Sequence, residues 1–173
     1  MNHYLFAILF FLPAGLANIA PILAKRIPIL KNWTAPIDMG KKFRGKRMLG
    51  KNKSWRGIIT GVLVAGVTGW VLYPLLNQVG GPLEHFLIGA TVGFGALLGD
   101  AVESFFKRQR GVKSGDSWLL FDQLDYVIGS MLFGLIYVRL DIRDYLAVIL
   151  FYFGGHLILT YIGFLLGLKD KPI

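Results

Sequence analysis

The sequence predicts an all-α integral membrane protein with five transmembrane helices. Hydrophobic residues make up 54% of its 173 residues, charged residues supply only 17%, and the mean hydropathy is +0.56. A soluble domain of this size needs a larger polar surface, and a disordered chain has far fewer apolar side chains. Because the chain has no cysteine, disulfide bonds and thiolate metal ligands are excluded. The bilayer is therefore the expected solvent.

Three apolar segments can cross a hydrocarbon core of roughly 30 Å, which takes about 20 helical residues. They lie at residues 4–24, 58–76 and 145–168. The first is followed by Lys25 and Arg26, whereas a signal peptide carries its basic flank before the apolar run. We therefore expect this segment to be kept as a membrane helix.

Two middle segments reach spanning length only if they include carboxylates. They are residues 86–106 with Asp100 and Glu103, and residues 117–138 with Asp122 and Asp125. Ionised groups inside a membrane are costly and usually functional. The alternative is that both helices are short, tilted or re-entrant, which still places the four acids close to the interface.

The distribution of Lys and Arg predicts the orientation. With five helices, 17 of the 19 basic residues fall in connections on one side and 2 on the other. We expect a single membrane domain, residues 1–173, in the cell membrane, with its amino terminus outside and its carboxyl terminus in the cytoplasm. Two functional loops, at about 25–57 and 107–117, would then face the cytoplasm.

Many of the 22 glycines are spaced four residues apart, which lets membrane helices approach closely. We interpret these pairs as packing surfaces within one bundle, and a homodimer is the alternative use. The pairs are Gly57/Gly61, Gly89/Gly93, Gly95/Gly99 and Gly163/Gly167.

The first loop is basic and punctuated by glycine. It carries 11 Lys and Arg residues between positions 25 and 56, with glycines at 40, 45, 50 and 57. Glycine lets backbone N–H groups approach phosphate oxygens, and Lys and Arg supply the countercharge. The Walker pattern G-x-x-x-x-G-K-[ST] is absent. Polyphosphate binding and attraction to anionic headgroups both remain open.

The end of the third predicted helix carries a polar stripe. Asp100, Glu103, Ser104 and Lys107 fall on one face if the helix continues, and Asp122 and Asp125 share a face of the fourth. A row of satisfied interfacial polar groups is the simpler interpretation. Clustered carboxylates resist ionisation without a cation, and Mg²⁺ prefers carboxylates, phosphate oxygens and water.

Other site chemistries are less well supported by the sequence. The three histidines are too scattered to share a zinc ion. Proton-relay transport stays open, although transporters place their acids near the midplane and show repeated halves. We expect no nucleic-acid partner, because the basic loop is held against a membrane.

Both loops resemble known enzymes. The first, Arg44-Gly-Lys-Arg-Met-Leu-Gly50 followed by Lys53-Ser-Trp-Arg-Gly57, resembles the archaeal CDP-archaeol synthase family. The second is similar to the signature of the wider CTP-dependent phosphatidate cytidylyltransferase group, with Gly99-Asp100, Ser104, Lys107-Arg108, Lys113 and Asp122/Asp125. The likeness spans roughly residues 38 to 129.

The chain departs from the wider group at two points. The Lys-Asp pair of the bacterial and eukaryotic signature is Lys113-Ser114 here, with Asp116 two places later, and Phe121 replaces the end of the His-Gly-Gly that precedes Asp122. These differences favour the archaeal branch and leave the role of Asp116 open.

The resemblance implies the reaction of CTP with an isoprenoid ether lipid phosphate, 2,3-di-O-geranylgeranylglyceryl phosphate, to give CDP-archaeol and pyrophosphate. Membrane lipids would surround the protein. The implied metal ligands for Mg²⁺ are Asp100, Asp122 and Asp125, with Glu103 and Asp116 as secondary candidates. Ser104 and Lys107 complete the implied catalytic set. The implied substrate-binding residues are Lys46, Arg47, Lys53, Ser54, Arg56, Arg108 and Lys113.

Three alternatives stay open. One is a phosphatidate cytidylyltransferase acting on an ester lipid, and another is a non-enzymatic protein that binds or transports anionic lipids. A CDP-alcohol phosphotransferase is the third, but its D-G-x-x-A-R…G-x-x-x-D-x-x-x-D pattern is absent.

Overall fold

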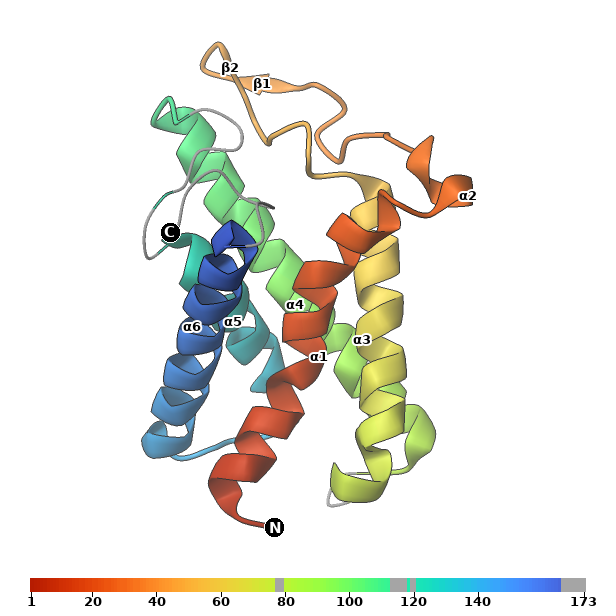
Figure 1. Cartoon of the computed structure of the whole chain (residues 1–173), viewed down its shortest axis with the longest axis vertical. Helices are drawn as coiled ribbons and strands as arrows, with labels where there is room; N and C mark the ends of the chain where they lie inside the picture. The colour runs from red at the N-terminus through yellow and green to blue at the C-terminus, as the bar shows by residue number, and fades with distance from the viewer. Residues whose placement is uncertain (77–79, 113–117, 119–120, 166–173) are drawn as a thin grey trace.

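The computed structural model describes residues 1–76, 80–112, 118 and 121–165, and the side chains of 159 and 163 are outside this description. The described chain is mostly helical (Figure 1). Four helices are long and apolar enough to cross a membrane. They are α1 (His3–Ala24), α3 (Trp55–Leu76), α4 (Pro82–Gln109) and α6 (Ile142–Leu165).

The fifth predicted span is shorter than expected. Helix α5 covers Phe121–Gly134, only 14 residues, instead of 117–138. Residues 135–137 form a turn, and residues 138–141 have no regular secondary structure before α6 begins at Ile142. Tyr137 and Val138 pack against the core without being helical. The structure therefore has four candidate spans and a half-length helix, so five spans are not confirmed.

The other predicted helices differ mainly at their ends. Helix α4 begins with Pro82 in its first turn, and the Gly81 N–H donates to Glu84 Oε2 at 2.7 Å. These features start the helix four residues earlier than its apolar run. Helix α6 likewise starts before the predicted 145, with Asp144 in its first turn. Acids there favour the helix dipole.

The first loop contains secondary structure that the sequence interpretation did not include. A short helix, α2 (Pro28–Lys31), follows α1. Strands β1 (Lys42–Phe43) and β2 (Lys46–Arg47) pair antiparallel around Arg44 and Gly45, whose φ angles are 49° and 77°. A two-residue turn with two positive φ angles fits the twist of a tight hairpin. The fold is thus helical with one small hairpin.

Helix α4 lies at the centre of the bundle, against α1, α3 and α5. Glycines permit these contacts. A Cβ on Gly61 would meet the Leu97 side chain of α4 at 2.7 Å, and one on Gly93 would collide with the Ala65 side chain. The interpretation of the spaced glycines as packing surfaces is confirmed for these positions. Gly167 lies outside the described residues.

The hydrophobic core forms where α1 meets α4, α5 and α6. Phe11 is 1% exposed and packs in one cluster with Val92, Val127 and Val148. The hairpin lies at the end of the bundle opposite the amino terminus (Figure 1). Lys46 Nζ donates to the Gln109 carbonyl at 2.6 Å, which joins the hairpin to the last turn of α4. The two predicted functional loops therefore meet at one end of the molecule.

Candidate functional site

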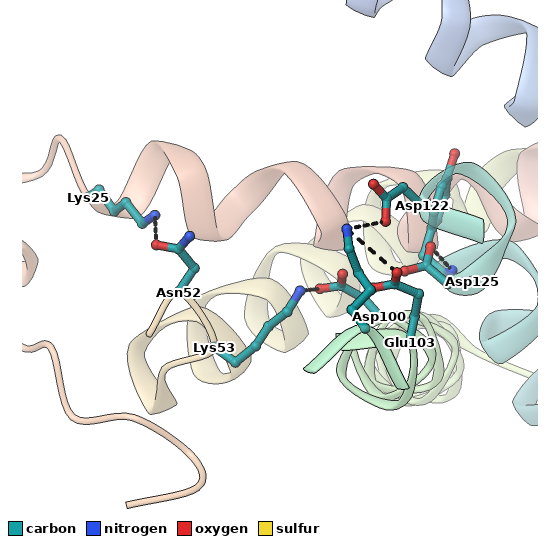
Figure 2. Close-up of polar contacts among 9 residues, drawn as sticks. Lys25, Asn52, Lys53, Asp100, Glu103, Asp122 and Asp125 are labelled. Carbon is teal, nitrogen blue, oxygen red and sulfur yellow. Dashed lines mark hydrogen bonds and ion pairs between the residues drawn. The ribbon is translucent and has the colours of Figure 1, made fainter. Parts of the chain in front are cut away.

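Three carboxylates from two helices form what we call the acid cluster. Asp100 and Glu103 lie on α4 and Asp125 lies on α5, with one oxygen of each within 4.8 Å of the others (Figure 2). The predicted metal trio contained Asp122 in place of Glu103. The structure thus brings Asp100 and Asp125 together as expected and adds Glu103, which was predicted only as a secondary candidate.

Lys107 forms ion pairs with both Asp122 and Glu103. Its Nζ lies 2.7 Å from Asp122 Oδ1 and 3.6 Å from Glu103 Oε1 (Figure 2). The second Asp122 oxygen accepts the Trp118 N–H at 2.8 Å. Lys107 is 7% exposed, so its charge acts with little screening. The lysine offsets the repulsion between neighbouring acids, and Asp122 is held by its own partners.

The first loop reaches the acid cluster through Lys53. Its Nζ forms an ion pair with Asp100 Oδ2 (Figure 2). Lys53 precedes α3, and Asp100 lies near the cytoplasmic end predicted for α4. The ion pair therefore unites the two motifs, which are separated by 47 residues in the chain.

A glycine contact between α4 and α5 sets the spacing of the acids. A Cβ on Gly99 would collide with the Asp125 carbonyl oxygen, and one on Gly129 would collide with the Gly95 carbonyl oxygen. The backbones approach this closely only because neither glycine has a side chain. Since Gly99 precedes Asp100 and faces Asp125, the contact holds the two carboxylates near each other.

A cavity of about 370 Å³ opens beside Asp100, and we call it the Asp100 cavity. Lys53 and Asp100 line one part, while Pro21, Ile22 and Leu97 line another. Ile22 is 60% exposed on α1. The cavity therefore combines a charged end with apolar walls that reach the outer surface of the helices.

The family model for CarS-like CDP-archaeol synthase matches residues 1–173. The CDP-archaeol synthase of Methanocaldococcus jannaschii is 33% identical, with 96% of each chain covered. This chain belongs to the CDP-archaeol synthase family. The family that the sequence motifs indicated is thereby confirmed.

Further family comparisons agree. The CDP-archaeol synthase of Thermofilum pendens is 36% identical over 96% of this chain and 79% of its own length. A solved structure described as an intramembrane enzyme for archaeal membrane lipids biosynthesis has a TM-score of 0.77 and 26% identity. The matched region covers 88% of this chain and 91% of the chain in that structure. With the four candidate spans, these likenesses identify the family member as a membrane protein.

Several of the predicted substrate-binding residues make contacts with other residues of this chain. Arg47 donates to Asp38 from Nε at 3.1 Å and from Nη2 at 3.0 Å. Ser54 Oγ accepts the Gly57 N–H at 3.3 Å and so caps α3. Ser104 is buried on α4, and Arg108 is half-buried one turn later. Lys113 and Asp116 lie outside the described residues.

Asp38 is an organising residue to which the sequence interpretation gave no role. Besides Arg47, it accepts the N–H groups of Gly40 at 3.0 Å and Leu49 at 2.9 Å. Burial raises the pKa of this carboxyl, but these hydrogen bonds and the Arg47 charge outweigh it and hold the pKa below its ordinary value. The Asp-x-Gly pattern of residues 38–40 is typical of a turn, and it is the sequence signal that could have predicted this role.

The donor chemistry of the acid cluster fits a magnesium ion. All three donors are carboxylates, the hard oxygen ligands that Mg²⁺ prefers. Glu103 Oε1 is buried and accepts no hydrogen bond from any described residue, although Lys107 lies at ion-pair distance. A buried carboxylate oxygen without a hydrogen bond is costly, and a bound cation would satisfy it.

Proposed function

We propose that this chain transfers CMP from CTP to 2,3-di-O-geranylgeranylglyceryl phosphate, giving CDP-archaeol and pyrophosphate. Family membership supports the reaction class. The observation that carries the proposal is the ion pair between Lys53 and Asp100, because it joins the basic loop to the acid cluster in one site. Such a site can bring two phosphate-bearing substrates together.

The proposed reaction needs no nucleophile from the protein. An oxygen of the lipid phosphate forms a bond to the α-phosphorus of CTP. The bond from that phosphorus to the bridging oxygen of the β-phosphate breaks, and pyrophosphate leaves with the electron pair. Catalysis of this kind is mostly positioning and charge neutralisation. Lysines beside a partly buried acid cluster supply both.

We assign the acid cluster to Mg²⁺. Asp100, Glu103 and Asp125 would hold the ion, and Asp122 would orient Lys107. When bound there, an ion would supply positive charge to neutralise the phosphate oxygens of the substrates. This assignment replaces Asp122 with Glu103 as a metal ligand, because an oxygen of Glu103 lies within 4.8 Å of an oxygen of each of the other two acids.

The Asp100 cavity is the proposed place of the lipid phosphate. Its charged end includes Lys53, which would bind the phosphate, and its wall along Pro21 and Ile22 would follow the hydrocarbon chains. Phosphate at the charged end would lie next to the acid cluster. Its oxygen would then be in position for attack on CTP.

The proposed orientation places this site at the cytoplasmic face of the cell membrane, with the amino terminus outside. The excess of Lys and Arg on one side supports this arrangement. The joining of the hairpin to α4 through Lys46 and Gln109 also supports it, since both basic segments then lie on the same side. Cysteine reagents that cannot cross membranes would test it on single-cysteine variants.

Pyrophosphate release by the purified chain tests the proposed reaction. We expect release from CTP only when both the ether lipid phosphate and Mg²⁺ are present. An Asp100→Asn/Asp125→Asn variant should release less than about one-hundredth as much. Equal release with an ester lipid phosphate would instead support the phosphatidate cytidylyltransferase alternative. Lipid binding without nucleotide turnover would support a non-enzymatic role.

A further inference from the structure

A second cavity, of about 380 Å³, lies beside the first and is lined mainly by cations. We call it the Arg56 cavity. Lys25, Lys31 and Lys51 lie on its exposed rim, and Arg56 is buried. Its lining residues, all of them described, include no carboxylate. An uncompensated set of four cationic side chains around a small cavity favours an anionic ligand.

Arg56 carries an unsatisfied donor. Its Nη1 donates to the Leu30 carbonyl at 2.9 Å and to the Lys31 carbonyl at 3.1 Å, but its buried Nε donates to none of the described residues. Arg56 is 4% exposed. A buried charged donor without an acceptor is costly. The Nε of this buried arginine therefore lacks an acceptor among the described residues, as expected where a ligand supplies one.

The cavity lies where the chain leaves the candidate spans. Helix α1 ends at Ala24 and α3 begins at Trp55, and the cavity is formed between these ends. The intervening segment exposes apolar side chains, with Ile29 89% exposed and Trp33 40% exposed. Exposed tryptophan and isoleucine beside basic residues are typical of the membrane interface. An anion reaching this position would be carried by a lipid.

We propose that the Arg56 cavity binds the phosphate monoester headgroup of the lipid substrate before it enters the Asp100 cavity. Lys25 and Asn52 line both cavities, and Lys25 Nζ donates to Asn52 Oδ1 at 3.3 Å. Both residues are exposed, so this hydrogen bond can open without unpacking the core. The lipid would thus bind first in the Arg56 cavity and then move to the Asp100 cavity.

A phosphate monoester matches the cavity better than a diester does. It carries roughly −1.5 to −2 charges at neutral pH, whereas a phosphodiester carries one. Three lysines and an arginine can make several charge-assisted hydrogen bonds to the three terminal oxygens of a monoester. This proposal rests on the proposed function for the identity of the lipid.

Direct binding without CTP or added metal tests the cavity. The full chain in nanodiscs of neutral lipid would be titrated with a dialkylglyceryl phosphate. We expect Lys31→Gln/Lys51→Gln to weaken binding by roughly tenfold. The control, Lys41→Gln/Lys42→Gln, changes the charge of the same loop equally but outside the cavity, and should change binding by less than about twofold. Equal weakening in both variants would overturn the proposal.

Two further sets of measurements identify the ligand. Inorganic phosphate binding as tightly as the lipid phosphate would overturn the lipid assignment, and so would equally tight binding of an anionic phosphodiester lipid. In turnover, Lys31→Gln/Lys51→Gln should raise KM for the lipid phosphate and leave KM for CTP and kcat unchanged. A raised KM for CTP would overturn the proposal. Cavity-dependent lipid binding by a chain that releases no pyrophosphate would overturn only the proposed function.

Discussion

Lys53 and Asp100 form an ion pair across the boundary between the basic loop and the helical bundle. Neither residue lies near the other in sequence, and the pair gives the candidate site both its cation and its anion. Asp100 also belongs to the acid cluster. The loop is thereby held over the carboxylates before any substrate arrives.

Loss of the Lys53 charge should impair turnover. We expect Lys53→Met to lower kcat/KM by about 100-fold, because a preorganised cation beside the reacting phosphates is removed. Lys41→Met is the matched control, since Lys41 is an exposed lysine of the same loop outside the Asp100 cavity. Pyrophosphate release measures both. Similar rates in the two variants would contradict the role of Lys53.

The assignments of Glu103 and Asp122 can be separated with a spectroscopic metal. We expect Glu103→Gln to weaken Mn²⁺ binding at least about tenfold, because it removes a direct carboxylate ligand. Asp122→Asn should change Mn²⁺ affinity by less than about threefold, since this residue pairs with Lys107. Electron paramagnetic resonance of free Mn²⁺ reports both affinities. The reverse order would restore Asp122 as the ligand.

The glycine contact between α4 and α5 should be sensitive to a single methyl group. We expect Gly99→Ala to destabilise the protein by about 1–3 kcal/mol, because its Cβ collides with the Asp125 carbonyl. Gly154→Ala is the control on α6, where a Cβ meets nothing within 4 Å, and it should not destabilise. Thermal unfolding in detergent distinguishes them. A stable Gly99→Ala protein would contradict the close approach.

The hydrogen bonds of Asp38 should make the first loop sensitive to acid. Because the pKa of this carboxyl is lowered by folding, its stabilisation is present above its ordinary pKa and is lost as the pH falls through the folded-state value. The amides of Gly40 and Leu49 should then exchange faster, after correction for intrinsic rates. In Asp38→Asn the exchange should be fast at neutral pH and nearly independent of acid. Unchanged protection in that variant would contradict this account.

The sequence predicted the membrane setting and much of the site because those signals are local. Apolar length predicted three of the four candidate spans, and the i, i+3 spacing placed Asp100 with Glu103. The choice between Glu103 and Asp122 is not local. It depends on how α5 is rotated against α4, which the contact of Gly99 with Asp125 determines.

The hydropathy pattern of the sequence also did not predict that α5 would be short. The hydrophobic run extends past Gly134 through the apolar residues Leu135, Ile136 and Val138. Composition alone therefore predicts that the helix continues. In the structure Gly134 packs against Phe11, and the chain turns after it. Tertiary packing overrides the local pattern here. The hairpin and Asp38 were missed because polar loop structure depends on turn chemistry more than on hydropathy.

Every described contact of the candidate site lies at the hairpin end of the bundle. The opposite end is therefore available for engineering. Helix α4 begins at the end of the bundle away from the hairpin (Figure 1), and Gly80, two residues before it, is exposed. Exposed positions between helices tolerate inserted domains. A rigid soluble protein fused there would give this 19.3 kDa chain enough mass for single-particle imaging while the substrate-facing end stays unobstructed.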